Sequence, residues 1–98
     1  MEATAYVNGV KVAESRRYIK LEGNVYFPPD SIVPRFFSRS ETRSVCPWKG
    51  VASYGNINVG DGNPLTDAAW SYTDPKKDAS HIKSYVAFDT SMVHVDLP

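Results

Sequence analysis

Residues 4–13 read TAYVNGVKVA, and this stretch decides the fold class. Apolar and polar side chains alternate on both sides of Asn8-Gly9, which is the period of a β-strand with one buried face. Asn and Gly tolerate the positive φ angles that a two-residue type I′ turn requires. The stretch therefore predicts a β-hairpin at the start of the chain.

Short runs with strand character recur along the rest of the chain, separated by Gly, Pro, Asn and Asp. The predicted strands are residues 18–21, 25–27, 51–59, 65–72, 84–88 and 92–97, with turns at residues 22–24, 60–64 and 89–91. No segment has the apolar spacing of a helix of three turns. About eight short strands, spaced roughly ten residues apart, favour an all-β sandwich or barrel-like sheet over an α/β fold.

The segments between these strands predict short irregular structure. Asp30 or Ser31 is expected to cap one helical turn that runs through Phe36, with Pro34 limiting its length. A second helical turn is expected near Asp78. Residues 38–44, SRSETRS, are polar and predict a mobile loop.

The length and charge of the chain restrict its class. The 98 residues are enough for one domain, which we expect to span residues 1–98. Eleven basic and eleven acidic residues cancel, which disfavours nucleic acid and membrane surfaces as partners. The basic residues nevertheless concentrate between residues 11 and 49. They form either a solvated surface or a local basic rim beside a pocket for an anionic ligand.

Cysteine and histidine usage points away from disulfides and metals. The single cysteine, Cys46, cannot form an internal disulfide, and His81 and His94 stand alone. The usual zinc sites need paired Cys or His ligands, so we expect no metal and no cofactor. The N-terminus lacks the basic run and apolar stretch of a signal peptide, and a cytoplasmic location is the expectation.

Four segments occur in an order that resembles a known family. They are VYFPPDSI (residues 25–32), CPWKGVASY (residues 46–54), DAAWSYTDP (residues 67–75) and SYVAFD (residues 84–89). Together with VNGVKVAES (residues 7–15), they resemble the DUF427 family over nearly the whole chain. The chain departs from the usual family pattern at Trp48, where tyrosine is common, and this difference suggests a changed ligand.

This resemblance implies a fold more than an activity. It implies a small antiparallel β domain similar to the β-tent architecture of methionine sulfoxide reductase B and of the ligand-binding domain of cereblon. With the strand pattern above, the expected fold is all-β and mainly antiparallel. It is a small β-tent or barrel-like sheet with one or two short helical turns.

Cys46 is the first candidate for chemistry. As a nucleophile it needs a thiol that is partly ionised, and either Arg43 or Lys49, each three residues away, has the charge to lower its pKa. The alternative is that Cys46 packs as a small hydrophobic side chain. The sequence shows no general base and no resolving cysteine beside it.

The aromatic residues give a second candidate site. Trp70 and Tyr72 are two residues apart in a predicted strand and therefore face the same side of a sheet. With Tyr26, Trp48 and Tyr54 they are candidates for the wall of a ligand pocket. Lys49, Asp67 and Arg43 are candidates for its polar contacts.

The favoured interpretation is a small-molecule-binding β domain in which Cys46, Trp48 and Lys49 face Trp70 and Tyr72 across one pocket. Such a pocket suits a flat ligand that carries an anionic or carbonyl group. Two alternatives stay open. The first is a cofactor-independent enzyme with Cys46 as nucleophile and Lys49 as its electrostatic partner, and the second is a protein-interaction module.

Overall fold

The computed structural model describes all 98 residues, and every sheet in it is antiparallel. Its nine strands are β1 (Ala3–Val7), β2 (Val10–Ser15), β3 (Ile19–Leu21), β4 (Asn24–Tyr26), β5 (Phe37–Cys46), β6 (Gly50–Ile57), β7 (Leu65–Ser71), β8 (Val86–Phe88) and β9 (His94–Asp96). Three short 3-10 turns complete the fold: η1 (Pro29–Ser31), η2 (Pro34–Phe36) and η3 (Lys77–Ile82). The predicted all-β, antiparallel fold with short helical turns is confirmed.

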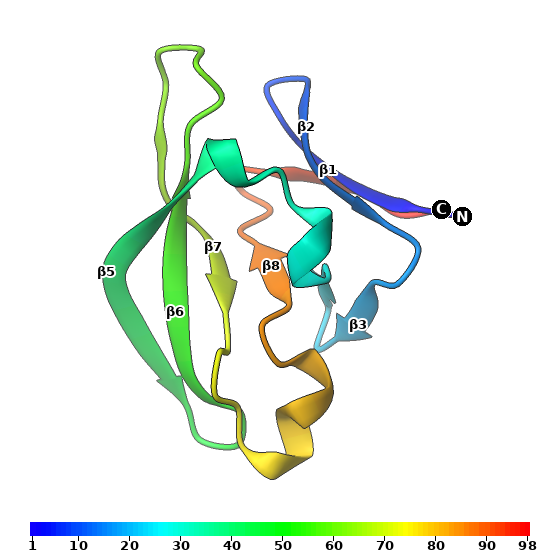
Figure 1. Ribbon diagram of the computed structural model, residues 1–98, viewed down its shortest axis with the longest axis vertical. Helices are drawn as coiled ribbons and strands as arrows, with labels where there is room; N and C mark the ends of the chain where they lie inside the picture. Colours follow the sequence, from blue (N-terminus) through cyan, green and yellow to red (C-terminus); the bar gives the residue numbers. More distant parts are fainter.

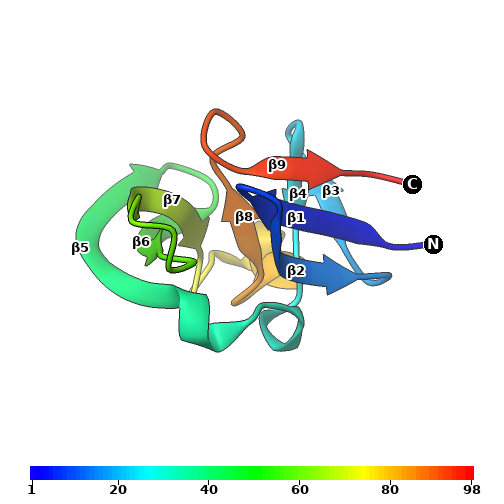
Figure 2. The same cartoon turned by 90° about the horizontal axis from the view of Figure 1, so that it is seen from above.

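The strands form three hydrogen-bonded groups, ordered β2-β1-β9, β3-β4 and β5-β6-β7-β8. A single bridge between Phe27 and Val86 joins the β3-β4 hairpin to β8. Figure 1 shows β5 and β6 curving along the long axis, while β1 and β2 run across the upper end of the molecule. Figure 2 shows β9 beside β1, with the two chain ends close together. The sheets do not close into a barrel.

Two hairpins form where the turn chemistry predicts them. Asn8 and Gly9 have φ angles of 50° and 81° between β1 and β2, as a type I′ turn requires. Glu22 and Gly23, with φ angles of 53° and 78°, make the same kind of connection between β3 and β4. The second turn projects the Glu22 side chain toward the candidate functional site described below.

The predicted polar loop at residues 38–44 is wrong, because these residues lie within β5. Their polar composition reflects an exposed edge strand, where charged and hydroxyl side chains protect the free edge from pairing with other chains. The pairing register with β6 shifts between Arg39 and Arg43, which marks a bulge. The bulge also interrupts the alternation by which a strand is recognised in a sequence.

The predicted helical turn at residues 30–36 is also different in detail. Two 3-10 turns occur there, each with proline near its start and neither with a capping side chain. Asp30 does not cap a turn, because its carboxylate accepts two hydrogen bonds from Arg17, at 2.8 and 2.9 Å. The helical turn predicted near Asp78 is confirmed as η3.

Alternation along the strands divides the interior into two apolar clusters. In β8, Phe88 belongs to a cluster beneath β1 and β2, whereas Ala87 belongs to a second cluster with Tyr72 and Ile82. Phe27 and Tyr26 divide between the two clusters in the same way. The second cluster therefore lies on the opposite face of the curved sheet. None of the helical turns is long and apolar enough to cross a membrane.

Candidate functional site

One cavity of about 290 Å³ lies on the face of the curved sheet that carries the second apolar cluster. Its lining brings together residues that are far apart in the sequence: Asn24, Tyr26, Lys49, Tyr54, Asp67, Trp70, Tyr72 and Asp89. The register explains the convergence, because Tyr54 pairs with Trp70 and directly opposed residues point to the same side of a sheet. Tyr72 follows Trp70 by two residues and shares that side.

The aromatic side chains of the cavity are held by contacts with one another. The Trp70 Nε1–H donates a hydrogen bond to the Tyr26 hydroxyl over 3.3 Å. The Tyr54 and Trp70 rings lie 6.4 Å apart between centroids, with an interplanar angle of 43°. The Tyr54 hydroxyl also hydrogen-bonds to Ser44 Oγ on β5, at 2.9 Å. Rings fixed in this way form a wall that exists before any ligand arrives.

Lys49 is the charged residue most deeply placed in the cavity. Only 8% of its side chain is exposed, and its ammonium lies 5.4 Å from the ring centroids of both Trp48 and Tyr72. The ammonium donates to Glu22 of the β3-β4 turn, and Trp48 Nε1–H donates to the other oxygen of the same carboxylate over 3.3 Å. Lys49 is therefore held by aromatic faces and by one carboxylate.

The turn that carries Lys49 is fixed by its backbone. Gly50 adopts a φ of 114°, which side-chain-bearing residues rarely adopt, and an added Cβ would lie 3.5 Å from the Asp74 carbonyl oxygen. The Lys76 N–H donates to the Lys49 carbonyl over 2.8 Å, and Lys76 Nζ donates to the Pro47 carbonyl over 2.6 Å. Residues 46–50 thus form a braced turn.

The ionisation of the site follows from these contacts. Burial lowers the pKa of Lys49, but the hydrogen bond to Glu22 and the neighbouring tyrosines raise it, and the net direction is upward. The hydrogen bond from Lys49 lowers the pKa of Glu22. Burial raises the pKa of Tyr72, against the opposing effect of Lys49. At neutral pH the site holds an ammonium, a carboxylate and a neutral phenol.

Asp67 occupies an irregular position in β7. Its φ of 56° is in the left-handed region, and the register with β6 shifts beside it. Its N–H donates to Asn56 Oδ1 over 2.9 Å, and its Oδ2 accepts from Thr42 over 2.7 Å. The buried Oδ1 has no hydrogen-bond partner. Strained backbone and an unpaired buried polar atom are more common at functional sites than elsewhere.

The structure brings together only some of the predicted site residues. Lys49, Trp70 and Tyr72 line the cavity, as do three further candidates, Tyr26, Tyr54 and Asp67. Cys46 is partly buried against the second apolar cluster and does not line the cavity. Trp48 covers the Lys49 ammonium from outside the lining, and Arg43 lines a different cavity.

Three contributors were not predicted from the sequence: Glu22, Asn24 and Asp89. Residues 22–24 carry a clear turn signal, but a turn signal does not indicate which distant side chain its residues will meet. The sequence around Asp89 is likewise typical of a turn, and the Asp89 carboxylate accepts hydrogen bonds from Ser91 N–H and from the Ser91 hydroxyl. No cluster of three or more His, Cys, Asp or Glu side chains is arranged to hold a metal ion.

Comparison with known proteins identifies one family. No curated protein shows significant similarity to the chain. The family described as a domain of unknown function (DUF427) matches residues 2–97, nearly the full length. The match agrees with the resemblance carried by residues 25–32, 46–54, 67–75 and 84–89. The chain therefore belongs to the DUF427 family.

Proposed function

We propose that this protein binds a flat, neutral, carbonyl-bearing small molecule in the aromatic cavity. The observation that carries the proposal is the convergence of four aromatic residues with the buried ammonium of Lys49 on one cavity. Ligand sites are typically concave, mainly apolar and equipped with a few fixed polar groups. At about 290 Å³ the cavity is near the lower limit of such sites, so it suits a ligand of one or two rings.

The charges around Lys49 favour a carbonyl group over an anion. The ammonium has three N–H donors, and Glu22 accepts from it. The carboxylates of Asp67 and Asp89 also line the cavity and would repel a ligand anion. A carbonyl oxygen accepts from the remaining ammonium protons or from a phenol without this penalty. A ligand N–H, in turn, has carboxylate acceptors available.

The test compares three flat probes of similar size: neutral 2-pyridone, anionic benzoate and cationic benzamidine. We expect 2-pyridone to bind best, detected as a saturable shift of the Trp70 indole N–H signal in NMR titrations. Tighter binding of benzoate or benzamidine would contradict the proposed ligand class. Absence of saturable binding by all three probes at millimolar concentration would contradict the site itself.

A variant pair assigns the role of the ammonium. Lys49→Met keeps most of the side-chain length between Trp48 and Tyr72 while removing the charge, and we expect it to weaken 2-pyridone binding about tenfold, or about 1.4 kcal/mol. Lys20→Met, at an exposed position on β3, is the matched control and should leave binding unchanged. Equal affinity in the two variants would show that Lys49 does not contact the ligand.

The two other functions have less support. Cys46 lies outside the cavity lining and among apolar side chains, which does not favour a nucleophile. A protein-interaction role rests only on the free strand edges. We keep the cytoplasm as the proposed location, because the lone cysteine is a free thiol.

A further inference from the structure

A second cavity, of about 570 Å³, lies on the other face of the β5–β8 sheet. We call it the arginine groove, and its lining is Phe37, Ser38, Arg39, Ser40, Arg43, Ser53, Tyr54, Gly55, Ala69, Trp70, Ser71, Thr73 and Val86. Tyr54 and Trp70 border both cavities, and the register separates the other side chains of β6 and β7. Ser53 pairs with Ser71, and these residues alternate with Tyr54 and Trp70, so their side chains point to the opposite face.

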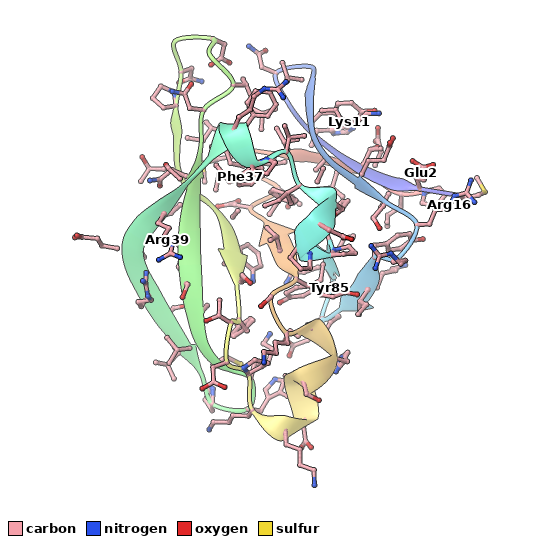
Figure 3. All side chains as sticks on the ribbon, in the orientation of Figure 1. Glu2, Lys11, Arg16, Phe37, Arg39 and Tyr85 are labelled. Atoms are coloured by element: carbon pink, nitrogen blue, oxygen red, sulfur yellow. The ribbon has the colours of Figure 1, made fainter.

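The bulge in β5 brings two arginines into neighbouring rows of this face. Arg39 is opposite Gly55, and Arg43 is opposite Ser53, so the arginines are four positions apart in sequence while their partners are only two positions apart. In a strand without the bulge, Arg43 would lie one more row of same-face residues away from Arg39. Figure 3 shows Arg39 over the β5-β6 strand pair, with Phe37 above it. The chain therefore concentrates two positive charges at one end of the groove.

These two arginines have no carboxylate partner. Arg43 Nη1–H donates only to the backbone carbonyls of Ser40, over 2.9 Å, and Thr42, over 2.8 Å. Arg39 forms no side-chain hydrogen bond or ion pair, whereas Arg16 and Arg17 each pair with a carboxylate elsewhere on the surface. No Asp or Glu lines the groove. The remaining guanidinium donors of Arg39 and Arg43 therefore have no carboxylate partner among the groove residues.

Hydroxyl groups complete a donor set around the groove. Ser53 and Ser71 are directly opposed across β6 and β7, and neither hydroxyl has a hydrogen-bond partner within the protein. Ser38 and Thr73 line the groove as well. Guanidinium groups supply paired N–H donors that match the oxygens of a phosphate, and hydroxyls add single donors. Gly55 and Ala69, with little or no side chain, line the groove in the same row as Arg39.

We propose that the arginine groove binds a phosphorylated small molecule, with its phosphate on Arg39, Arg43 and the serine hydroxyls and its apolar body toward Phe37 and Val86. This site lies on the sheet face opposite the aromatic cavity, with Tyr54 and Trp70 bordering both, and it stands independently of the function proposed for that cavity. Arg39 and Arg43 belong to the stretch between residues 11 and 49 in which the basic residues concentrate. In this proposal they form the local basic rim that the sequence leaves open as an alternative to a solvated surface.

The test uses phenyl phosphate as the probe, with phenol, benzoate and inorganic phosphate for comparison. We expect phenyl phosphate to bind saturably to the full chain and to shift the backbone amide signals of Ser53 and Ser71. Inorganic phosphate should bind at the same signals with lower affinity, because it lacks the apolar body. Phenol should not bind there. Equal affinity for benzoate and phenyl phosphate would overturn the assignment to phosphate.

Three arginine variants separate a built site from general surface charge. Arg39→Gln and Arg43→Gln change exposed side chains, so the fold should persist, and each should weaken phenyl phosphate binding at least tenfold. Arg16→Gln, at the far end of the molecule in Figure 3, removes the same charge and should change the affinity less than twofold. An equal loss in all three variants, or no loss in Arg39→Gln and Arg43→Gln, would overturn the proposal.

Discussion

Cys46 illustrates how the surroundings of one side chain decide its chemistry. Its neighbours in sequence, Arg43 and Lys49, suggest an activated thiol, but both cations are engaged elsewhere. Arg43 donates to backbone carbonyls on β5, and the Lys49 ammonium is paired with Glu22. Cys46 packs against the second apolar cluster, where a thiol behaves as a small hydrophobic side chain.

Replacing Cys46 should therefore have little effect on the site. We expect Cys46→Ser to keep the fold and to retain 2-pyridone affinity within about tenfold, or about 1.4 kcal/mol. The thiol of the unmodified protein should react slowly with iodoacetamide at neutral pH. Rapid alkylation, together with an activity that Cys46→Ser abolishes while binding survives, would support the nucleophile instead.

At the level of elements, the aromatic cavity depends on two turns whose side chains are hydrogen-bonded to each other. The β3-β4 turn supplies Glu22, and the braced turn at residues 46–50 supplies Trp48 and Lys49. The β3-β4 hairpin also joins the curved sheet through the bridge between Phe27 and Val86 and the hydrogen bond from Trp70 to Tyr26. The contacts of Glu22 connect it, in addition, to the turn at the start of β6. The ion pair thus links two elements of the fold and also fixes Lys49 in the aromatic cavity.

This connection predicts a pH dependence of stability. Because the folded-state pKa of Glu22 lies below its ordinary value of 4.5, the contribution of Glu22 is present above that value and is lost as the pH falls through the folded-state pKa. In urea unfolding, Glu22→Gln should lower the midpoint at pH 7, and the gap to the unmodified protein should narrow toward pH 3. Glu41→Gln, on the exposed edge strand, serves as the control. A gap that stays constant between pH 7 and pH 3 would contradict the ion pair.

The same elements show what the sequence could reveal. Asn8-Gly9 predicts its hairpin because local turn chemistry is sufficient there, and the spacing of Trp70 and Tyr72 places both on one face because strand periodicity is also local. Strand β5 is not predicted because residues 38–44 of this exposed, bulged edge have neither alternation nor apolar side chains. The pairing of Glu22 with Lys49 depends on how two hairpins meet, and no local pattern encodes it.

At the scale of the whole molecule, one curved sheet separates two unlike cavities. Residues of β6 and β7 alternate in side-chain direction. Tyr54 and Trp70 form the aromatic wall and also border the arginine groove, whereas Ser53 and Ser71 line the groove alone. The three-stranded sheet β2-β1-β9 contributes buried residues to the first apolar cluster. A domain of 98 residues thereby presents two cavities on a single layer of strands.

This arrangement predicts that the two sites can be occupied at the same time. Trp70 lines both cavities, but its indole N–H is hydrogen-bonded to Tyr26, so we expect occupancy of the groove to leave that ring in place. We expect saturating phenyl phosphate to change the dissociation constant of 2-pyridone by less than about threefold, and linkage requires the reverse effect to be equal. NMR titration of each probe, with and without the other at saturation, measures both values. Competition, seen as a 2-pyridone dissociation constant that rises in proportion to phenyl phosphate concentration, would show that the probes share one site and that the two faces do not act separately.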